Sequence, residues 1–343
     1  MKKYKVGIIG ATGMVGQRFA LLLSEHPWFD VTVLAASSRS AGVTYKEALG
    51  DRWCMTEPTP AKYLDLVVLD AEKDIEKIAS SVDFVFCAVN MSKEETKALE
   101  EKYAKAECPV VSNNSAFRMA EDVPMVVPEL NADHIKIIES QRKRLGTKRG
   151  FIAVKSNCSL QSYVPALYPL DKAGYTVKDV LVCTYQAISG AGKTFDRWPE
   201  MIDNVIPYIG GEEEKSEKEP LKIWGQVQGD EIALANGPAI TAQCLRVPVS
   251  DGHTAAVFVS FEKKPTKEEM GDVPHHMIDI VPPEESFSVE RYCRLAKGII
   301  EDIHNRGKLP IMVGGTGLYS DNTVYGTEFT APKRDEEISE SLR

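Results

Sequence analysis

The sequence lacks the features that mark several protein classes. None of its 343 residues belongs to an apolar run near the roughly eighteen that a membrane span needs, and the N-terminus shows no signal-peptide region. The seven cysteines form no Cys-x-x-Cys pair and no metal-ligand spacing, which favours free thiols in a reducing compartment. Positive charge is in deficit, because the net charge is -9 and the isoelectric point about 5.4. These absences predict a soluble cytoplasmic protein without membrane, metal or nucleic-acid binding as its main task.

Internal repeats and low-complexity segments are also absent, and the apolar pattern changes once along the chain. Up to residue 150, short apolar strands alternate with helical patterns such as 93–105, which predicts an α/β fold with a doubly wound, mostly parallel sheet. The strands are expected near 4–10, 31–36, 65–70, 83–89 and 109–112. Longer strands at 151–155, 177–186, 239–246 and 255–261 predict a second, mixed sheet.

A glycine-rich turn follows the first strand. Gly10, Gly13 and Gly16 have the spacing G-x-x-G-x-x-G, with Thr12, Met14 and Val15 between them and a helical pattern afterwards. Glycines in a strand-turn-helix unit let backbone amides approach a pyrophosphate. A turn that merely packs a helix on a strand is the plainer interpretation, and context favours the dinucleotide site.

The second strand ends in Ser37, Ser38, Arg39 and Ser40. A site that prefers NAD places an acidic residue there for the ribose hydroxyl, whereas hydroxyls and a guanidinium suit a 2′-phosphate. We therefore predict NADP as the cofactor. The plainer interpretation is a solvated loop.

One cysteine stands in a context typical of covalent catalysis. Cys158 follows Asn157, and the apolar spacing from Leu160 predicts a helix directly after it. A single cysteine is more often a small buried residue than a nucleophile. With His253 and Arg246 about ninety residues later, behind a dinucleotide loop, it is suited to form a thioester from an aldehyde.

Six ordered segments make residues 1 to about 269 resemble the aspartate-semialdehyde dehydrogenase family. They are 10–16, 38–42, 112–119, 156–159, 185–192 and 246–253. The resemblance implies a Rossmann-type NADP-binding domain at 1–150 and a catalytic and dimerisation domain at 151–269. It also implies the reversible, NADP-dependent interconversion of L-aspartyl 4-phosphate with L-aspartate 4-semialdehyde and phosphate, in lysine, threonine and methionine biosynthesis. The expected assembly is a homodimer or homotetramer.

The resemblance also assigns catalytic roles. Cys158 resembles the nucleophile, His253 the general acid and base, and Gln186 the residue that orients the substrate at the thiol. Asn157 is placed to offer its amide to a developing oxyanion.

The remaining family positions concern the anionic substrate and the cofactor. Arg246 resembles the arginine that makes a forked contact with the α-carboxylate, a geometry that lysine cannot copy. The other substrate-binding positions are Arg118 and Lys215 for phosphate, Glu212 for the ammonium group, and Asn114; Ser189 and Gly190 border the cofactor. Glu212 and Lys215 lie in a charged run, 212–219, for which a solvated loop is the alternative.

The segment 189–194 imitates the end of a phosphate-binding P-loop. The first glycine of the P-loop pattern would fall at position 187, which is Ala. No later apolar run ends in a convincing magnesium-binding Asp. A nucleoside-triphosphate site is therefore not expected.

The C-terminal region departs from the family. Residues from about 271 to 343 resemble an internal piece of tRNA dimethylallyltransferase, so we interpret the chain as a chimera with a third part at 270–343. A helix is expected at 284–306, where apolar residues form one stripe. His275 and His276 lack further ligands at a useful spacing, so no metal is expected there.

Several functions remain open from sequence alone. An active dehydrogenase is favoured by every catalytic position, and an inactive dimeric remnant by the departure of the C-terminal region. A reductase acting on N-acetylglutamyl phosphate would not need Glu212 to bind a free ammonium group. A tRNA prenyl transferase fragment is favoured only by the tail and the P-loop imitation.

Overall fold

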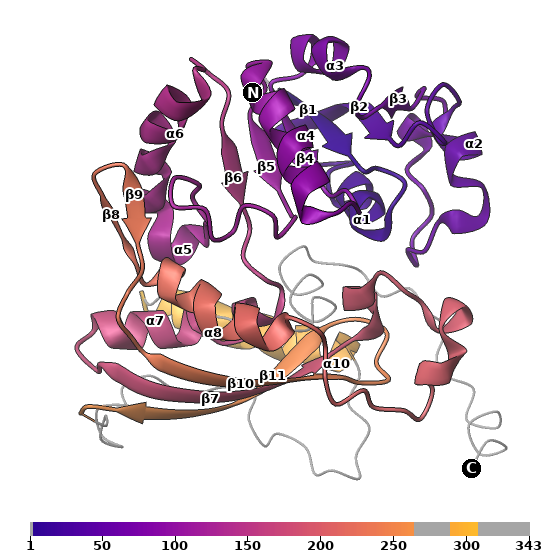
Figure 1. The fold of residues 1–343 in the computed structure, drawn as a ribbon. Coiled ribbons are helices and arrows are strands. Elements are labelled where there is room, and N and C mark those ends of the chain that lie inside the picture. Colours follow the sequence, from indigo (N-terminus) through magenta and orange to yellow (C-terminus); the bar gives the residue numbers. More distant parts are fainter. Residues whose placement is uncertain (1–2, 264–288, 308–343) are drawn as a thin grey trace, which may run out of the picture. The chain divides into compact units, whose positions relative to one another are not determined.

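A computed structural model describes residues 3–263 and 289–307 of the chain. Residues 1–264 form one compact unit and residues 265–343 a second one. The first unit contains a six-stranded sheet, a three-stranded sheet and a two-stranded hairpin (Figure 1). The predicted division into a parallel and a mixed sheet is therefore confirmed.

The six-stranded sheet is parallel throughout, with the strand order β3-β2-β1-β4-β5-β6. Its strands are β1 (Tyr4–Ile9), β2 (Phe29–Ala36), β3 (Leu69–Asp70), β4 (Phe84–Cys87), β5 (Val110–Ser112) and β6 (Ile152–Val154). The connecting helices are α1 (Met14–Leu22), α2 (Tyr45–Leu49), α3 (Ile75–Ser81), α4 (Lys93–Lys105), α5 (Pro128–Asn131) and α6 (Ile138–Leu145). The strand order reverses between β1 and β4. In open α/β sheets, dinucleotides bind outside the carboxyl ends of the strands at such a reversal.

Local sequence explains why α4 spans the predicted residues. Ser92 caps the helix by accepting a hydrogen bond from the backbone of Glu95, whose carboxylate accepts one from the backbone of Ser92. Leu99 and Tyr103 then bury one face against the sheet.

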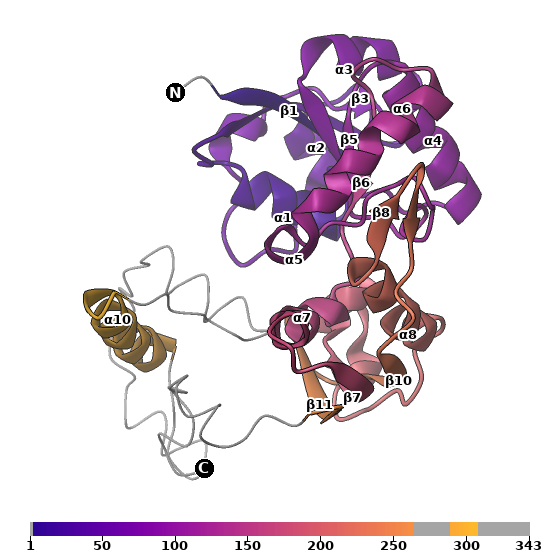
Figure 2. The same cartoon turned by 90° about the vertical axis from the view of Figure 1, so that its left-hand side faces the viewer.

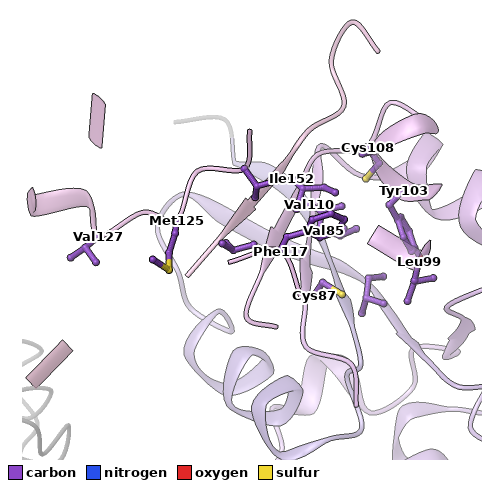
Figure 3. Packing of buried hydrophobic residues seen from close by; sticks show 14 of the residues in the cluster. Val85, Cys87, Leu99, Tyr103, Cys108, Val110, Phe117, Met125, Val127 and Ile152 are labelled. Carbon is purple, nitrogen blue, oxygen red and sulfur yellow. The ribbon is translucent and has the colours of Figure 1, made fainter. Parts of the chain in front are cut away.

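The core of this domain joins strands that are distant in sequence. Val85, Val110 and Ile152 come from β4, β5 and β6, are fully buried, and lie in one cluster with Leu99 and Tyr103 (Figure 3). Strands buried on both faces are typical of parallel sheets covered by helices.

One strand prediction was wrong. Residues 151–155 were expected in the second sheet, but β6 pairs in parallel with β5 at the edge of the first. The side chain of Gln141 fixes this edge, because it donates to the Ile152 carbonyl at 2.9 Å and accepts from the Ile152 amide at 2.6 Å. The first sheet therefore continues past residue 150.

The second sheet consists of β7 (Val177–Gln186) between β10 (Ala239–Arg246), which is parallel to it, and β11 (His253–Phe261), which is antiparallel. Helices α7 (Val164–Lys172) and α8 (Glu212–Ile223) lie on the same face of this sheet (Figures 1 and 2). The hairpin of β8 (Gln226–Gln228) and β9 (Glu231–Ala233) follows α8. One face of the sheet is thus covered within the chain.

Within the second unit, the structure describes α10 (Val289–Asn305) and the turn after it. The predicted helix is confirmed over these residues. His275, His276 and most of the predicted third part lie outside the described residues.

Candidate active site

Three predicted residues lie side by side at one edge of the second sheet. Gln186 ends β7, and it pairs with Arg246 at the end of β10 and with His253 at the start of β11. Because β10 runs parallel to β7 and β11 runs antiparallel, the end of one neighbour and the start of the other meet at this edge. The sheet register therefore brings together residues that are up to 67 positions apart in sequence.

Cys158 reaches this edge from the loop that follows β6. Its Sγ lies 3.2 Å from Nε2 of His253. The helix expected after Cys158 begins as a short 3₁₀ turn, Ser159–Ser162, and continues as α7 after a break at Tyr163. Cys158 as a whole residue keeps access to solvent, although the surrounding protein desolvates its sulfur, and its two neighbours in sequence are buried. The structure thus brings the predicted nucleophile and base into direct contact.

The surroundings of Cys158 favour its ionised form. Burial of the sulfur opposes ionisation, but the hydrogen bond and charge of His253, followed by the charge of Lys155, hold the pKa of the thiol below its usual value. Burial also lowers the pKa of Lys155, while the charge of Cys158 acts against that effect. Lys155 is a member of the site that sequence reasoning missed, although it stands only three residues before the cysteine.

His253 is held from two sides. The backbone N–H of Ala187 donates to its Nδ1 at 3.1 Å, while Nε2 faces the sulfur. Burial lowers the pKa of His253, but the hydrogen bond and charge of Cys158 outweigh burial, so that the pKa is raised overall. The cysteine and the histidine therefore titrate as an interacting pair.

Glu212 is a centre of contacts at the first turn of α8, so the charged run is a helix rather than a solvated loop. Its carboxylate accepts hydrogen bonds from Lys215 at 2.6 Å, Asn157 at 2.8 Å and Gln186 at 3.4 Å. Burial raises the pKa of Glu212, but the hydrogen bond and charge of Lys215 and then the two amides outweigh burial, so the pKa is lowered overall. Glu212 therefore remains a carboxylate beside the thiol.

The side-chain amide of Asn157 is hydrogen-bonded to other residues of the chain. Its Nδ2 donates to Glu212, and its Oδ1 accepts from both the amide and the hydroxyl of Ser159. These bonds fix the peptide on either side of Cys158. The predicted contact with an oxyanion stays a prediction.

Arg118 takes part in a buried ion pair. Its Nη1 donates to Glu219 at 3.1 Å, and the other oxygen of Glu219 accepts from the backbone of Asn157 at 2.6 Å. The second Nη donates to the Asn113 carbonyl, while Nε is buried without a partner among the described residues. Arg118 is thus linked through Glu219 to the peptide that precedes the nucleophile.

Lys222 holds the loop that carries Arg118. Its ammonium group donates to the carbonyls of Arg118, Ala120 and Val123 at 2.6–2.8 Å, and burial lowers its pKa to about 8. Neither Lys222 nor Glu219 was singled out in the sequence. Glu219 lies seven residues after Glu212, which places both on one helical face, and this spacing was the available signal.

Asn114 points into a buried polar cluster. Its Nδ2 donates to Glu100 at 2.9 Å and approaches Cys87 Sγ at 3.4 Å, and Ser112 donates to the same carboxylate oxygen of Glu100. The predicted contact of Asn114 with substrate remains untested.

We expect Glu100→Gln to reduce the loss of stability at rising pH. Burial raises the pKa of Glu100, although hydrogen bonds from Ser112, Asn114 and Cys87 lower it in part. Between its unfolded and folded pKa values, the folded state binds more protons, so wild-type stability falls as pH rises, by at most about 1.4 kcal/mol per pH unit for one group. Urea unfolding from pH 4 to 8 checks this, with Glu101→Gln as the control; parallel pH curves for wild type and Glu100→Gln would contradict it.

The glycine loop has the geometry of a phosphate cradle. A Cβ on Gly10, whose φ is 89°, would lie 2.3 Å from the Ala88 carbonyl, and one on Gly16 would lie 2.2 Å from the Gly10 carbonyl. Gly13 is exposed at the start of α1, where no side chain caps the helix. Open N–H groups at this helix end therefore fit a dinucleotide pyrophosphate.

Thr12, Met14 and Val15 lie in the same turn and first helical residues. Thr12 accepts a hydrogen bond from Gln17 through its carbonyl, at 3.0 Å. Val15 is exposed and Met14 is half-buried. The contacts of these three residues with a cofactor stay a prediction.

Ser37, Ser38 and Arg39 are exposed immediately after β2, while Ser40 is buried. Since β2 neighbours β1 in the sheet, these residues follow the same edge as the glycine loop. Ser189 and Gly190 lie in a 3₁₀ turn, Ile188–Ala191, between β7 and α8. Among the described residues, no group of three or more acidic, His or Cys side chains could hold a metal ion.

Comparison with known families agrees with this arrangement. Residues 5–138 match the family model described as semialdehyde dehydrogenase, NAD binding domain, and residues 167–285 match semialdehyde dehydrogenase, dimerisation domain. The fold and the two family models thus place the chain among the semialdehyde dehydrogenases as a class.

The curated relatives specify the family. Aspartate-semialdehyde dehydrogenase of Archaeoglobus fulgidus is 44% identical over 269 residues, 78% of this chain and 74% of the relative. The enzyme of Saccharomyces cerevisiae is 38% identical over 269 residues, with 76% and 72% covered. The chain belongs to the aspartate-semialdehyde dehydrogenase family.

Solved structures agree with this assignment. Aspartate semialdehyde dehydrogenase from Candida albicans, solved with NADP, has a TM-score of 0.68 at 39% identity, covering 77% of this chain and 73% of that one. Aspartate semialdehyde dehydrogenase II from Vibrio cholerae, complexed with ASA, has a TM-score of 0.59 at 26% identity, with 79% and 78% covered. The Rossmann-type fold and the second domain are therefore confirmed.

The C-terminal region matches a different family. Residues 261–343 match the model described as IPP transferase, in agreement with the resemblance predicted for the tail. No helix among the described residues has both the length and the apolar character to cross a membrane.

Proposed function

We propose that the chain is an NADP-dependent aspartate-semialdehyde dehydrogenase that interconverts L-aspartyl 4-phosphate with L-aspartate 4-semialdehyde and phosphate, in aspartate-family amino-acid biosynthesis. The observation on which this proposal depends most is the 3.2 Å contact between Cys158 Sγ and His253 Nε2, on the sheet edge that also presents Arg246. A thiol of lowered pKa beside a histidine is suited to attack a carbonyl.

In the biosynthetic direction, the Cys158 thiolate attacks the acyl phosphate. An S–C bond forms, the C–O bond to phosphate breaks, and a thioester remains on the enzyme. NADPH held at the glycine loop would supply the hydride that this thioester requires. The C–S bond then breaks as the aldehyde leaves, and His253 protonates the departing sulfur; in the reverse direction it accepts the thiol proton.

The substrate is held by residues around the thiol. Arg246, only 5% exposed, offers a planar fork to the α-carboxylate. The carboxylate of Glu212, now hydrogen-bonded to Lys215, would hold the ammonium group of the substrate and release Lys215 toward phosphate. The buried Arg118 Nε, unpartnered among the described residues, is a further donor for an anion.

The decisive experiment is phosphate-dependent reduction of NADP by the whole purified chain with L-aspartate 4-semialdehyde. Activity that disappears in Cys158→Ala supports the proposal. N-acetyl-L-glutamate 5-semialdehyde serves as the comparison substrate, because it lacks the free ammonium group that Glu212 would bind. Absence of turnover in a folded chain would favour the inactive remnant.

Replacing Arg39 with Asp should shift the cofactor preference from NADP toward NAD. The exposed guanidinium after β2 would donate charge-assisted hydrogen bonds to a 2′-phosphate, worth about 1.5–3 kcal/mol, or about 10- to 100-fold in KM for NADP. Steady-state kinetics with both cofactors check this, with Arg39→Lys as the charge-conserving control. Equal changes for NADP and NAD would refute the assignment.

A homodimer through the face of the second sheet opposite α7 and α8 is the proposed assembly. Leu181 and Phe258 are 52% and 69% exposed and lie opposite each other in the register of β7 and β11. Exposed apolar side chains on a sheet whose other face is covered by α7 and α8 suit pairing with a second copy.

Phe258→Glu is expected to convert the dimer to a monomer, because a carboxylate would be buried without a partner in the interface. Analytical ultracentrifugation measures the change. Trp28→Glu, at a position 58% exposed in the first domain, should leave the dimer intact. Identical association of wild type and Phe258→Glu would exclude this face as the interface.

We further propose that the chain is a chimera of most of one enzyme and a fragment of another. The match to the dimerisation model ends at residue 285, and the match to IPP transferase begins at residue 261. Whether the dehydrogenase tolerates this tail is decided by the turnover experiment above.

A further inference from the structure

The backbone of Ala187 binds both functional side chains that flank Gln186 in the sheet. Its N–H donates to His253 Nδ1 at 3.1 Å, and its carbonyl accepts from Arg246 Nη1 at 2.8 Å. Ala187 is fully buried, so these bonds are largely protected from competition with solvent. The two peptide groups that flank this residue therefore fix the direction of the imidazole and of the guanidinium.

The turn after Ala187 is itself anchored to the connection between β10 and β11. The amide of Ile188 donates to the Val249 carbonyl at 2.9 Å, and that of Ser189 donates to the Ser250 carbonyl at 3.2 Å. The turn cannot shift without breaking contacts to the segment that leads from Arg246 to His253.

Gly190 completes the turn at a point where a side chain has no room. A Cβ there would lie 2.7 Å from Arg246 Nη1, 3.0 Å from His253 Cε1 and 3.1 Å from His253 Nε2. Its φ lies outside the left-handed region, so the requirement for glycine is steric rather than conformational. A single added methyl group would press on the base and on the arginine at once.

We propose that the turn 187–191 aligns the base and the carboxylate-binding arginine, and that Gly190 is a positioning residue within it. This inference rests on the proposed function. The turn acts through the backbone bonds of Ala187 to His253 and Arg246 and through the lack of a side chain at Gly190.

Gly190→Ala tests the positioning role, with Gly298→Ala in α10 as the matched control, because each change adds one methyl group and a Cβ on Gly298 would meet no atom of the described residues within 4 Å. The readouts are the pH dependence of Cys158 alkylation by iodoacetamide and kcat/KM for the semialdehyde. The charged groups around the thiol are His253 from β11, Arg246 from β10, Glu212 from α8, and Lys155.

In Gly190→Ala, the apparent pKa of the thiol should rise and kcat/KM should fall by about 10²-fold, while Gly298→Ala matches wild type. Circular dichroism establishes that each variant is folded. An unchanged alkylation profile in a folded Gly190→Ala protein would overturn the positioning role even if the enzyme proves inactive. If this variant does not fold, hydrogen exchange of the wild-type chain decides: the Ala187 amide should exchange slowly because it is bonded to His253, and exchange as fast as that of an exposed loop amide would overturn the alignment.

Discussion

Replacement of His253 by asparagine is expected to lower turnover by about 10²- to 10⁴-fold and to raise the pKa of the Cys158 thiol. The hydrogen bond and charge of His253 are the largest influences that lower this pKa against the effect of burial. Without them, burial of the sulfur dominates and the thiol is protonated over more of the neutral range. The variant loses both thiolate at a given pH and the group that moves protons during turnover.

Two measurements separate these losses. The pH dependence of alkylation reports the pKa of the Cys158 thiol. Pre-steady-state turnover at a pH above the shifted pKa, where the thiol is ionised in both proteins, reports the loss of proton transfer alone. The control is His26→Asn, since His26 is half-buried and stacks on Phe29 in the first domain. A His253→Asn enzyme with the wild-type alkylation profile would show that another group activates the thiol, and Lys155 would then be the first candidate.

The sequence predicts the second-domain strands well because they are long and end at recognisable residues. Strands β7 and β10 cover the predicted ranges 177–186 and 239–246 without a shift. Their register could not be predicted, because nothing local states that Gln186 pairs with both Arg246 and His253. Pairing depends on contacts between distant segments.

The misassigned strand has a similar explanation. A three-residue apolar strand such as Ile152–Val154 has the same pattern in either sheet. Its place is decided by the open edge of β5 and by the side chain of Gln141, which binds both the N–H and the C=O of Ile152. Neither partner can be recognised from the strand itself.

Buried charges were the hardest members of the site to predict. Lys155, Glu219 and Lys222 are charged residues, for which solvent exposure is the ordinary expectation. The structure buries Glu219 and Lys222 almost completely, because each finds partners on the segment from Asn113 to Val123 or beside Cys158. Motif matching identifies the residues that contact substrate in a family, but not those that hold them.

Glu219→Gln is the substitution that we expect to destabilise the chain most, by about 3–5 kcal/mol. The carboxylate is 2% exposed and balances the buried Arg118, while its second oxygen accepts from the Asn157 amide. Glutamine keeps the shape but leaves the guanidinium uncompensated, and one of its two ends presents a donor to another donor. The loss should appear in urea unfolding as a lower midpoint at nearly constant slope.

The matched control lies on the same helix. Glu214→Gln removes an equal charge from an exposed pair with Lys218, whose members are 67% and 59% exposed, and should cost less than about 1 kcal/mol. Arg118→Met combined with Glu219→Gln should recover part of the stability, because it removes the unpaired charge. Similar unfolding midpoints for Glu219→Gln and Glu214→Gln would mean that the Arg118–Glu219 pair does not support the peptide before Cys158, and the nucleophile would then depend on Asn157 and Ser159 alone for its position.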